Sequence, residues 1–173
     1  GKIPDRVPIF PMIDSIPAEK LGLSIESYYN SAENVVKGQK MLQDHLNLDY
    51  ISNFFYLAIE SEIFGMETLF FEEGSPNTGE PCVDSLDFFL NNDPPNLLVH
   101  EAYRKTIKTT KRLAEQFKGE KPILSVQSGP FSFPSLLMGT SKWFESILMN
   151  PEKIKDVLEY SIDFGEAWAK RSE

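Results

Sequence analysis

Residues 121–139 read KPILSVQSGPFSFPSLLMG, and this stretch decides the fold of the chain. It begins with the apolar run Pro122–Val126, breaks at a short polar segment with Gly and Pro, and resumes as a helix-like run through Phe133 and Leu137. A short apolar run bounded by Pro and Gly is typical of a strand in a parallel sheet. Ligands bind at the loop after such a strand, so Gln127 and Ser128 are candidate binding residues. The alternative is that the Gly-Pro pair forms only a tight turn.

Strand-like and helix-like segments alternate along the chain, which predicts an α/β fold with at least three parallel strands. The predicted strands are Arg6–Phe10, Asp49–Phe55 and Pro122–Val126, with a hairpin in which Met66–Phe71 pairs with Cys82–Val83. The predicted helices are one that begins at Ser24 or Ser31, one over Leu57–Phe64 that Gly65 ends, a short one that begins near Asp84, one over Leu97–Phe117, and one that begins at Pro151.

The composition limits the classes of partner. The 173 residues carry a formal net charge of −9, which argues against nucleic acid and against an anionic membrane surface. No apolar run approaches the roughly 20 residues of a membrane helix. The single cysteine, Cys82, excludes internal disulfides and is typical of a protein of the reducing cytoplasm. The first residue is not Met and a helical pattern is still running at Glu173, so we expect a segment of a longer protein.

Two groups of polar residues have an ordinary structural interpretation. In the helix predicted at Leu97–Phe117, a basic cluster lies off the apolar stripe and is interpreted as a solvated face; it consists of Arg104, Lys105, Lys108, Lys111 and Arg112. His45 lies near the apolar stripe of its own helix and is interpreted as a packed residue. His45, His100 and Cys82 show no paired spacing, so the sequence contains no metal motif.

Carboxylates follow two of the predicted strands. Glu60 and Glu62 come after the second strand, where a carboxylate can accept a proton or orient a substrate. Because residues two apart on a helix face different ways, at most one of the two is expected to point into a site. Asp14 is a candidate for the same positional reason, and the alternative for each is a solvated carboxylate. Asn53 and Tyr56 lie near the same strand end, where aromatic residues are commonly part of the core.

Four segments taken in order resemble the uroporphyrinogen decarboxylase superfamily. They are DRVPIFPM, IESEIFGMETLFFEEGSP, KPILSVQSGPFSFPSLLMG and NPEKIKDVLEYSIDFGEAWAK. The resemblance covers nearly all of this chain but only about the first half of such a protein. It implies a (β/α)8 TIM barrel, with residues 1–173 as the N-terminal part of a single barrel domain.

The same resemblance separates two branches of the superfamily. True decarboxylases carry a Met-Arg-Gln-Ala-Gly-Arg motif that holds substrate carboxylates, and Ile13 and Pro17 stand at its two arginine positions. Their essential aspartate falls at Tyr56 and their active-site tyrosine at Leu136. A polyanionic porphyrinogen needs cationic partners, so the pattern favours the branch of methyltransferases that exchange methyl groups with corrinoid proteins.

That branch implies a cofactor, partners and site residues. Zinc activates a thiol in some of its members, through a His-x-Cys and a later Cys that would lie outside this chain, and the corrinoid is carried by a partner protein. The expected substrate is a small thiol, tetrahydrofolate or a methylated compound. By position, Glu60 and Asp14 are the catalytic candidates; the substrate-binding candidates are Met12, Asn53, Tyr56, Gln127, Ser128 and Phe131.

Three hypotheses follow. The first is a corrinoid-linked methyltransferase, and the second is a uroporphyrinogen decarboxylase that holds its substrate differently. The third is a non-catalytic barrel segment stabilised by a partner or by a second copy, because a half barrel leaves open sheet edges.

Overall fold

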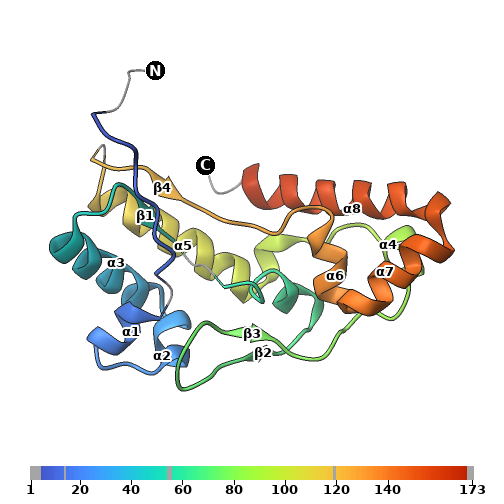
Figure 1. Ribbon diagram of the computed structural model, residues 1–173, viewed down its shortest axis with the longest axis horizontal. Coiled ribbons are helices and arrows are strands. Elements are labelled where there is room, and N and C mark those ends of the chain that lie inside the picture. Colours follow the sequence, from blue (N-terminus) through green and yellow to red (C-terminus); the bar gives the residue numbers. More distant parts are fainter. Residues whose placement is uncertain (1–4, 14, 54–55, 119, 171–173) are drawn as a thin grey trace.

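The apolar run at 122–126 forms strand β4 (Ile123–Leu124), which pairs in parallel with β1 (Ile51–Ser52), Ile51 lying opposite Ile123. The computed structural model describes residues 5–13, 15–53, 56–118 and 120–170 (Figure 1). The polypeptide leaves β1, crosses the molecule, and returns to β4 through helix α5 (Glu101–Gln116). This strand, helix, strand order is the unit from which α/β barrels are built.

Helices α3 (Ala32–Leu46) and α5 pack against each other and against the strand pair. Ile51 is fully buried in a small cluster with Leu113 of α5 and with Phe117, the residue that follows this helix. An apolar strand covered by helices in this way explains why its sequence reads as a continuous hydrophobic run.

Of the other elements, the two short helices that precede α3 pack against it, and the later helices lie at the other end of the molecule (Figure 1). The remaining helices are α1 (Ile16–Lys20), α2 (Ile25–Tyr29), α4 (Asp87–Asn91), α6 (Ser132–Met138), α7 (Thr140–Met149) and α8 (Pro151–Lys170). Two 3-10 helices, η1 (Ser61–Phe64) and η2 (Leu97–Val99), and an antiparallel hairpin of β2 (Thr68–Leu69) and β3 (Asn77–Thr78) complete the fold. Aromatic residues fill the larger core, with the rings of Phe133 and Phe164 stacked at 4.6 Å between centroids. Among the helices described, none is both long and apolar enough to cross a membrane.

Local signals in the sequence set the ends of several helices. Ser24 and Ser31 were alternatives for one helix start, and both are N-caps: each hydroxyl accepts a backbone N–H, at the start of α2 and α3 respectively. Gly65 ends η1 in the left-handed conformation with φ of 83°. Pro151 begins α8 as predicted.

The strand predicted at Arg6–Phe10 is absent from the described structure. Residues 7–13 have no regular secondary structure, and Val7 is 85% exposed. The backbone N–H of Ile9 donates instead to the carboxylate of Asp49, at 3.0 Å. Pro8 offers no N–H, so the segment has little ability to form a ladder with β1.

Two further predictions about strands are wrong. Within the described residues only β1 and β4 pair in parallel, so a third parallel strand is not formed. The hairpin strand β2 pairs with Asn77–Thr78 and not with Cys82–Val83. The N–H groups of Cys82 and Val83 donate instead to the carbonyl of Leu137, which ties this segment to α6.

The helix predicted at Leu57–Phe64 is present only as the 3-10 turn η1, and α7 was not predicted. His45 is exposed at the end of α3, and its Nδ1 lies 2.8 Å from the carbonyl of Met41, so the packed interpretation is wrong. Lys105 is only 8% exposed, which contradicts its assignment to a solvated face.

Candidate functional site

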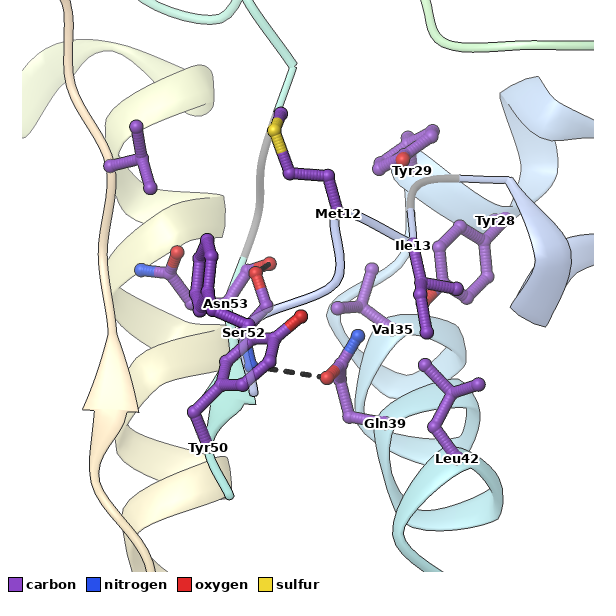
Figure 2. A pocket seen from close by; sticks show the side chains of 12 residues that line it. Met12, Ile13, Tyr28, Tyr29, Val35, Gln39, Leu42, Tyr50, Ser52 and Asn53 are labelled. Carbon is purple, nitrogen blue, oxygen red and sulfur yellow. Dashed lines mark hydrogen bonds between the residues drawn. The ribbon is translucent and has the colours of Figure 1, made fainter. Parts of the chain in front are cut away.

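A cavity of about 140 Å³ lies between the N-terminal segment, α2, α3 and the end of β1 (Figure 2). It is lined by Phe10, Met12, Ile13, Tyr28, Tyr29, Val35, Gln39, Leu42, Tyr50, Ser52, Asn53 and Val126. Figure 2 shows Met12 between the two walls, with Tyr50, Ser52 and Asn53 on one side and Tyr28, Gln39 and Leu42 on the other. Two of the predicted substrate-binding residues, Met12 and Asn53, therefore line the same space.

Asn53 fixes the segment after β1 against its neighbours. Its Nδ2 donates to the hydroxyl of Thr110 on α5 at 3.0 Å and to the hydroxyl of Ser125 after β4 at 3.1 Å. The side chain is buried, and its Oδ1 has no hydrogen-bond partner in the described part of the chain. Asn53 thus joins the two strand ends at the edge of the cavity.

Gln39 is a wall residue that the sequence did not identify. Its Oε1 accepts the backbone N–H of Ser52 at 3.1 Å, so it connects α3 to β1 (Figure 2). Burial raises the pKa of Tyr28, and a hydrogen bond with Gln39 opposes that rise. Gln39 stands four residues after Val35 and three before Leu42, on the apolar face of α3. A polar residue in an apolar stripe was the signal that could have found it.

A smaller cavity of about 40 Å³ lies beside the first one. It is lined by Tyr56, Leu57, Ile59, Glu60, Val126, Gln127 and Ser128. Val126 lines both cavities, and the ring of Tyr29 in the first packs edge-on against that of Tyr56 in the second, at 5.1 Å between centroids. Four more of the predicted residues, from the loops after β1 and β4, therefore meet next to the first two.

Glu60 is the carboxylate of the smaller cavity. It is 3% exposed, and both of its oxygens lie 3.0 Å from the backbone nitrogen of Ser128, which donates to them. Burial raises the pKa of Glu60, while hydrogen bonds from Ser128 act in the opposite direction. A buried carboxyl with a raised pKa is suited to exchange a proton near neutral pH.

Glu62 does not line the cavity, so one of the two carboxylates points into it, as their spacing predicts. Its Oε1 accepts the hydroxyl of Tyr56 at 2.9 Å and the hydroxyl of Thr68 at 2.6 Å. Lys105 donates to the same Tyr56 hydroxyl at 2.9 Å and to Oδ1 of Asn30 at 3.2 Å. Burial lowers the pKa of Lys105, whereas the negative charge of Glu62 raises it. The phenol of Tyr56 is thereby held between a cation and a carboxylate.

The last two candidates are not part of this arrangement. Asp14 lies outside the described residues. Phe131 lines neither cavity; its ring is half exposed and packs edge-on against Trp143 at 5.6 Å between centroids.

The walls determine what the site can hold. Among the lining residues described for the two cavities, none carries a positive charge and Glu60 alone carries a carboxyl. The site therefore offers aromatic and aliphatic surface, amides, and one proton-exchanging group.

The described residues do not fit a zinc ion. No three His, Cys, Asp or Glu side chains of the described chain are close enough together to hold a metal. A structural zinc site needs four ligands and a catalytic one about three, so nothing in this part of the protein is assigned to a metal.

Comparisons with known proteins agree with this geometry at the level of the fold. A family model described as uroporphyrinogen decarboxylase (URO-D) matches residues 1–171. A methyltransferase from Methanosarcina mazei has a similar structure, with a TM-score of 0.82 at 15% sequence identity, over 98% of this chain and 52% of that one. The search of curated proteins gives no match.

The fold is therefore that of the family's TIM barrel, and the chain spans about half the length of the methyltransferase that it matches. Because the family model covers almost all of its residues, the chain belongs to the uroporphyrinogen decarboxylase family.

Proposed function

We propose that this chain is part of a methyltransferase that moves a methyl group between a corrinoid protein and a small thiol, tetrahydrofolate or methylated substrate. The observation that carries the proposal is the absence of positive charge from the described walls of both cavities. A polyanionic porphyrinogen requires cations at bidentate distance. The structural similarity to a methyltransferase supports the same choice.

In this proposal the larger cavity binds the small molecule, and the smaller cavity holds the carboxyl group that donates or accepts a proton. The buried rings of Tyr28, Tyr29 and Tyr50 exclude water from one side of the bound molecule, which strengthens polar contacts within the site. Glu60 exchanges a proton with the substrate, and the N–H of Ser128 keeps its carboxyl in place. The corrinoid, carried by a partner protein, supplies the atom that carries the methyl group. Zinc, if the intact enzyme uses it, takes its ligands from residues outside this chain.

The family description names a competing reaction, the decarboxylation of uroporphyrinogen. One preparation of the intact gene product can be tested for both reactions, methyl transfer and decarboxylation. It is incubated with methylcobalamin and either 2-mercaptoethanol or tetrahydrofolate, and the loss of the methyl–cobalt absorbance is followed. A parallel incubation with uroporphyrinogen is analysed for lost carboxylates.

We expect demethylation of the corrinoid and no loss of carboxylates. Decarboxylation without demethylation would overturn the proposal. If neither reaction occurs, the non-catalytic hypothesis gains support, and sedimentation of the 173-residue chain separates a monomer from an assembly that covers the open edges of β1 and β4.

A further inference from the structure

Lys105 places a cation inside the core of this chain. It lies on α5 and is only 8% exposed. Moving an ammonium group out of water costs free energy, and an apolar side chain of similar volume often fills such a site with no loss of stability. A lysine at this position is therefore not explained by stability alone.

The ammonium group of Lys105 holds parts of both cavity walls. Its Nζ donates to the hydroxyl of Tyr56, a wall residue of the smaller cavity, at 2.9 Å. It also donates to Oδ1 of Asn30, the C-cap of α2, at 3.2 Å. Helix α2 carries Tyr28 and Tyr29, which line the larger cavity. One charged group thus sets the end of α2 at a fixed distance from Tyr56.

The hydroxyl of Tyr56 also closes the segment that carries Glu60. It donates to Oε1 of Glu62 at 2.9 Å, and the hydroxyl of Thr68 donates to the same oxygen at 2.6 Å. Glu60 lies between Tyr56 and Glu62 in the sequence, so the two ends of its segment are bonded to each other. Neither Lys105 nor Glu62 lines the smaller cavity. The contact with Lys105 therefore supports the Glu60 segment from outside the cavity.

We propose that Lys105 is a positioning residue: through the hydroxyl of Tyr56 it fixes the segment that carries Glu60 relative to α2, so that a molecule in the larger cavity lies against the carboxyl of the smaller one. This role rests on the proposed function, in which Glu60 exchanges a proton with that molecule. A reacting group misplaced by about 1 Å can lose about a hundredfold in rate. Loss of the ammonium is therefore expected to impair the reaction more than the binding of the molecule.

Lys105→Met removes the ammonium and keeps an unbranched side chain of similar size. In the methylcobalamin assay on the intact gene product, we expect kcat to fall about tenfold or more, while KM for the small molecule stays within about twofold. Tyr56→Phe removes the hydroxyl through which Lys105 acts, so it is expected to lower kcat by at least a similar factor. Adding Lys105→Met to Tyr56→Phe is expected to cause little further loss. Two effects on kcat that multiply in the double variant overturn the proposal.

Lys121 provides a matched control for the loss of a partly buried lysine. Its Nζ donates to Oε1 of Gln43 at 2.8 Å and to Oδ1 of Asn47 at 2.7 Å, but Lys121 lines neither cavity. Lys121→Met is therefore expected to lose stability and to keep kcat. An equal fall of kcat in Lys121→Met and Lys105→Met would show a general effect of destabilisation and overturn the positioning role.

A second background separates positioning from charge balance. Glu62→Gln keeps an acceptor for the hydroxyl of Tyr56 and removes the charge that Lys105 could balance. In this background Lys105→Met is still expected to lower kcat. An unchanged kcat would mean that Lys105 only neutralises Glu62, and the proposal would then be wrong.

The positioning role can also be tested without the reaction. If the unmodified gene product transfers no methyl group, the proposed function fails, and NMR of the 173-residue chain labelled at Ile methyl groups decides the role of Lys105. Ile59 lines the smaller cavity, so its signals are expected to shift in Lys105→Met and not in Lys121→Met. Should Lys105→Met fail to fold, Tyr56→Phe takes its place in both tests. Unchanged Ile59 signals overturn the positioning role.

Discussion

Replacing Gly38 by Ala tests how closely α3 packs on the two short helices before it. A Cβ atom built on Gly38 lies 2.7 Å from the Cβ of Pro17 and 2.7 Å from both Cε2 and the hydroxyl oxygen of Tyr28. Carbon atoms in contact are about 3.5–4.0 Å apart, so the added methyl group overlaps each neighbour by about 1 Å. Pro17 is buried and Tyr28 is 1% exposed, so neither can turn into solvent.

The expected loss follows from two opposing effects. Overfilling a packed core costs about 1–3 kcal/mol, whereas Ala is favoured over Gly inside a helix by about 1 kcal/mol. The net loss of unfolding free energy is therefore about 0–2 kcal/mol. In a chain of this size the upper value of 2 kcal/mol corresponds to a fall in Tm of about 4–8 °C.

Gly165 provides a matched control because it also lies inside a helix, α8. There the built Cβ meets only the Nε2 of Gln127, at 3.3 Å. Gln127 is exposed and its side chain can move away, so Gly165→Ala is expected to gain up to about 1 kcal/mol.

Urea unfolding followed by circular dichroism at 222 nm measures both variants, and an unchanged m-value shows that the unfolded state is comparable. The reasoning is refuted if Gly38→Ala is as stable as Gly165→Ala. In that case α3 would not pack against Pro17 and Tyr28 at the distances described.

Three further changes have expected outcomes. Tyr56→Phe removes a buried hydroxyl that makes hydrogen bonds with Glu62 and Lys105, and it should lower the free energy of unfolding by about 1–2 kcal/mol. Tyr160→Phe removes a buried hydroxyl with no partner in the described chain and should leave the free energy of unfolding unchanged. Thermal unfolding compares the two variants. Because the folded state raises the pKa of Glu60 above its ordinary 4.5, the wild type should gain stability relative to Glu60→Gln as the pH falls from above the raised pKa to about 4.5. Unfolding at several pH values tests this, and the absence of any such slope would show that Glu60 titrates as a solvated carboxyl. Ser31→Ala removes the N-cap of α3 and should cost about 1 kcal/mol in urea unfolding, with Ser31→Asp restoring most of it.

Features of the fold that depend on neighbouring residues could be predicted from the sequence. Serine caps, a left-handed Gly65 and Pro151 at a helix start are local devices, and each acts within one turn of chain. The apolar run at 122–126 also identified β4, because burial on both sides leaves a continuous hydrophobic signature.

The buried face of α5 could not be found by counting apolar residues. Thr106 and Thr109 are almost fully buried, and their hydroxyls donate to the carbonyls of Ala102 and Lys105 one turn earlier. A threonine satisfied in this way behaves as a small core residue. The true buried stripe is therefore rotated from the apolar one, and Lys105 lies on it.

Some residues of the candidate site could be predicted from the sequence, and others could not. Position after a strand was sufficient to select Glu60, Gln127 and Ser128, which lie together at the smaller cavity. The tyrosines and Gln39 of the larger cavity come from α2, α3 and the start of β1, and only the folded chain brings these elements together.

The pairing of β1 with β4 also has a consequence for how the chain folds. Asn53 and Ser125, which are hydrogen-bonded beside these strands, are 72 positions apart. The entropy cost of closing so long a loop arises before the stabilising contacts between the strands can form, so such pairings form late in folding. The helices and the β2–β3 hairpin depend on shorter separations and form earlier. During refolding we therefore expect the contact of Trp143 with Phe131, which are 12 positions apart, to form before the two cavities, because both cavities require the segments that follow β1 and β4 to meet.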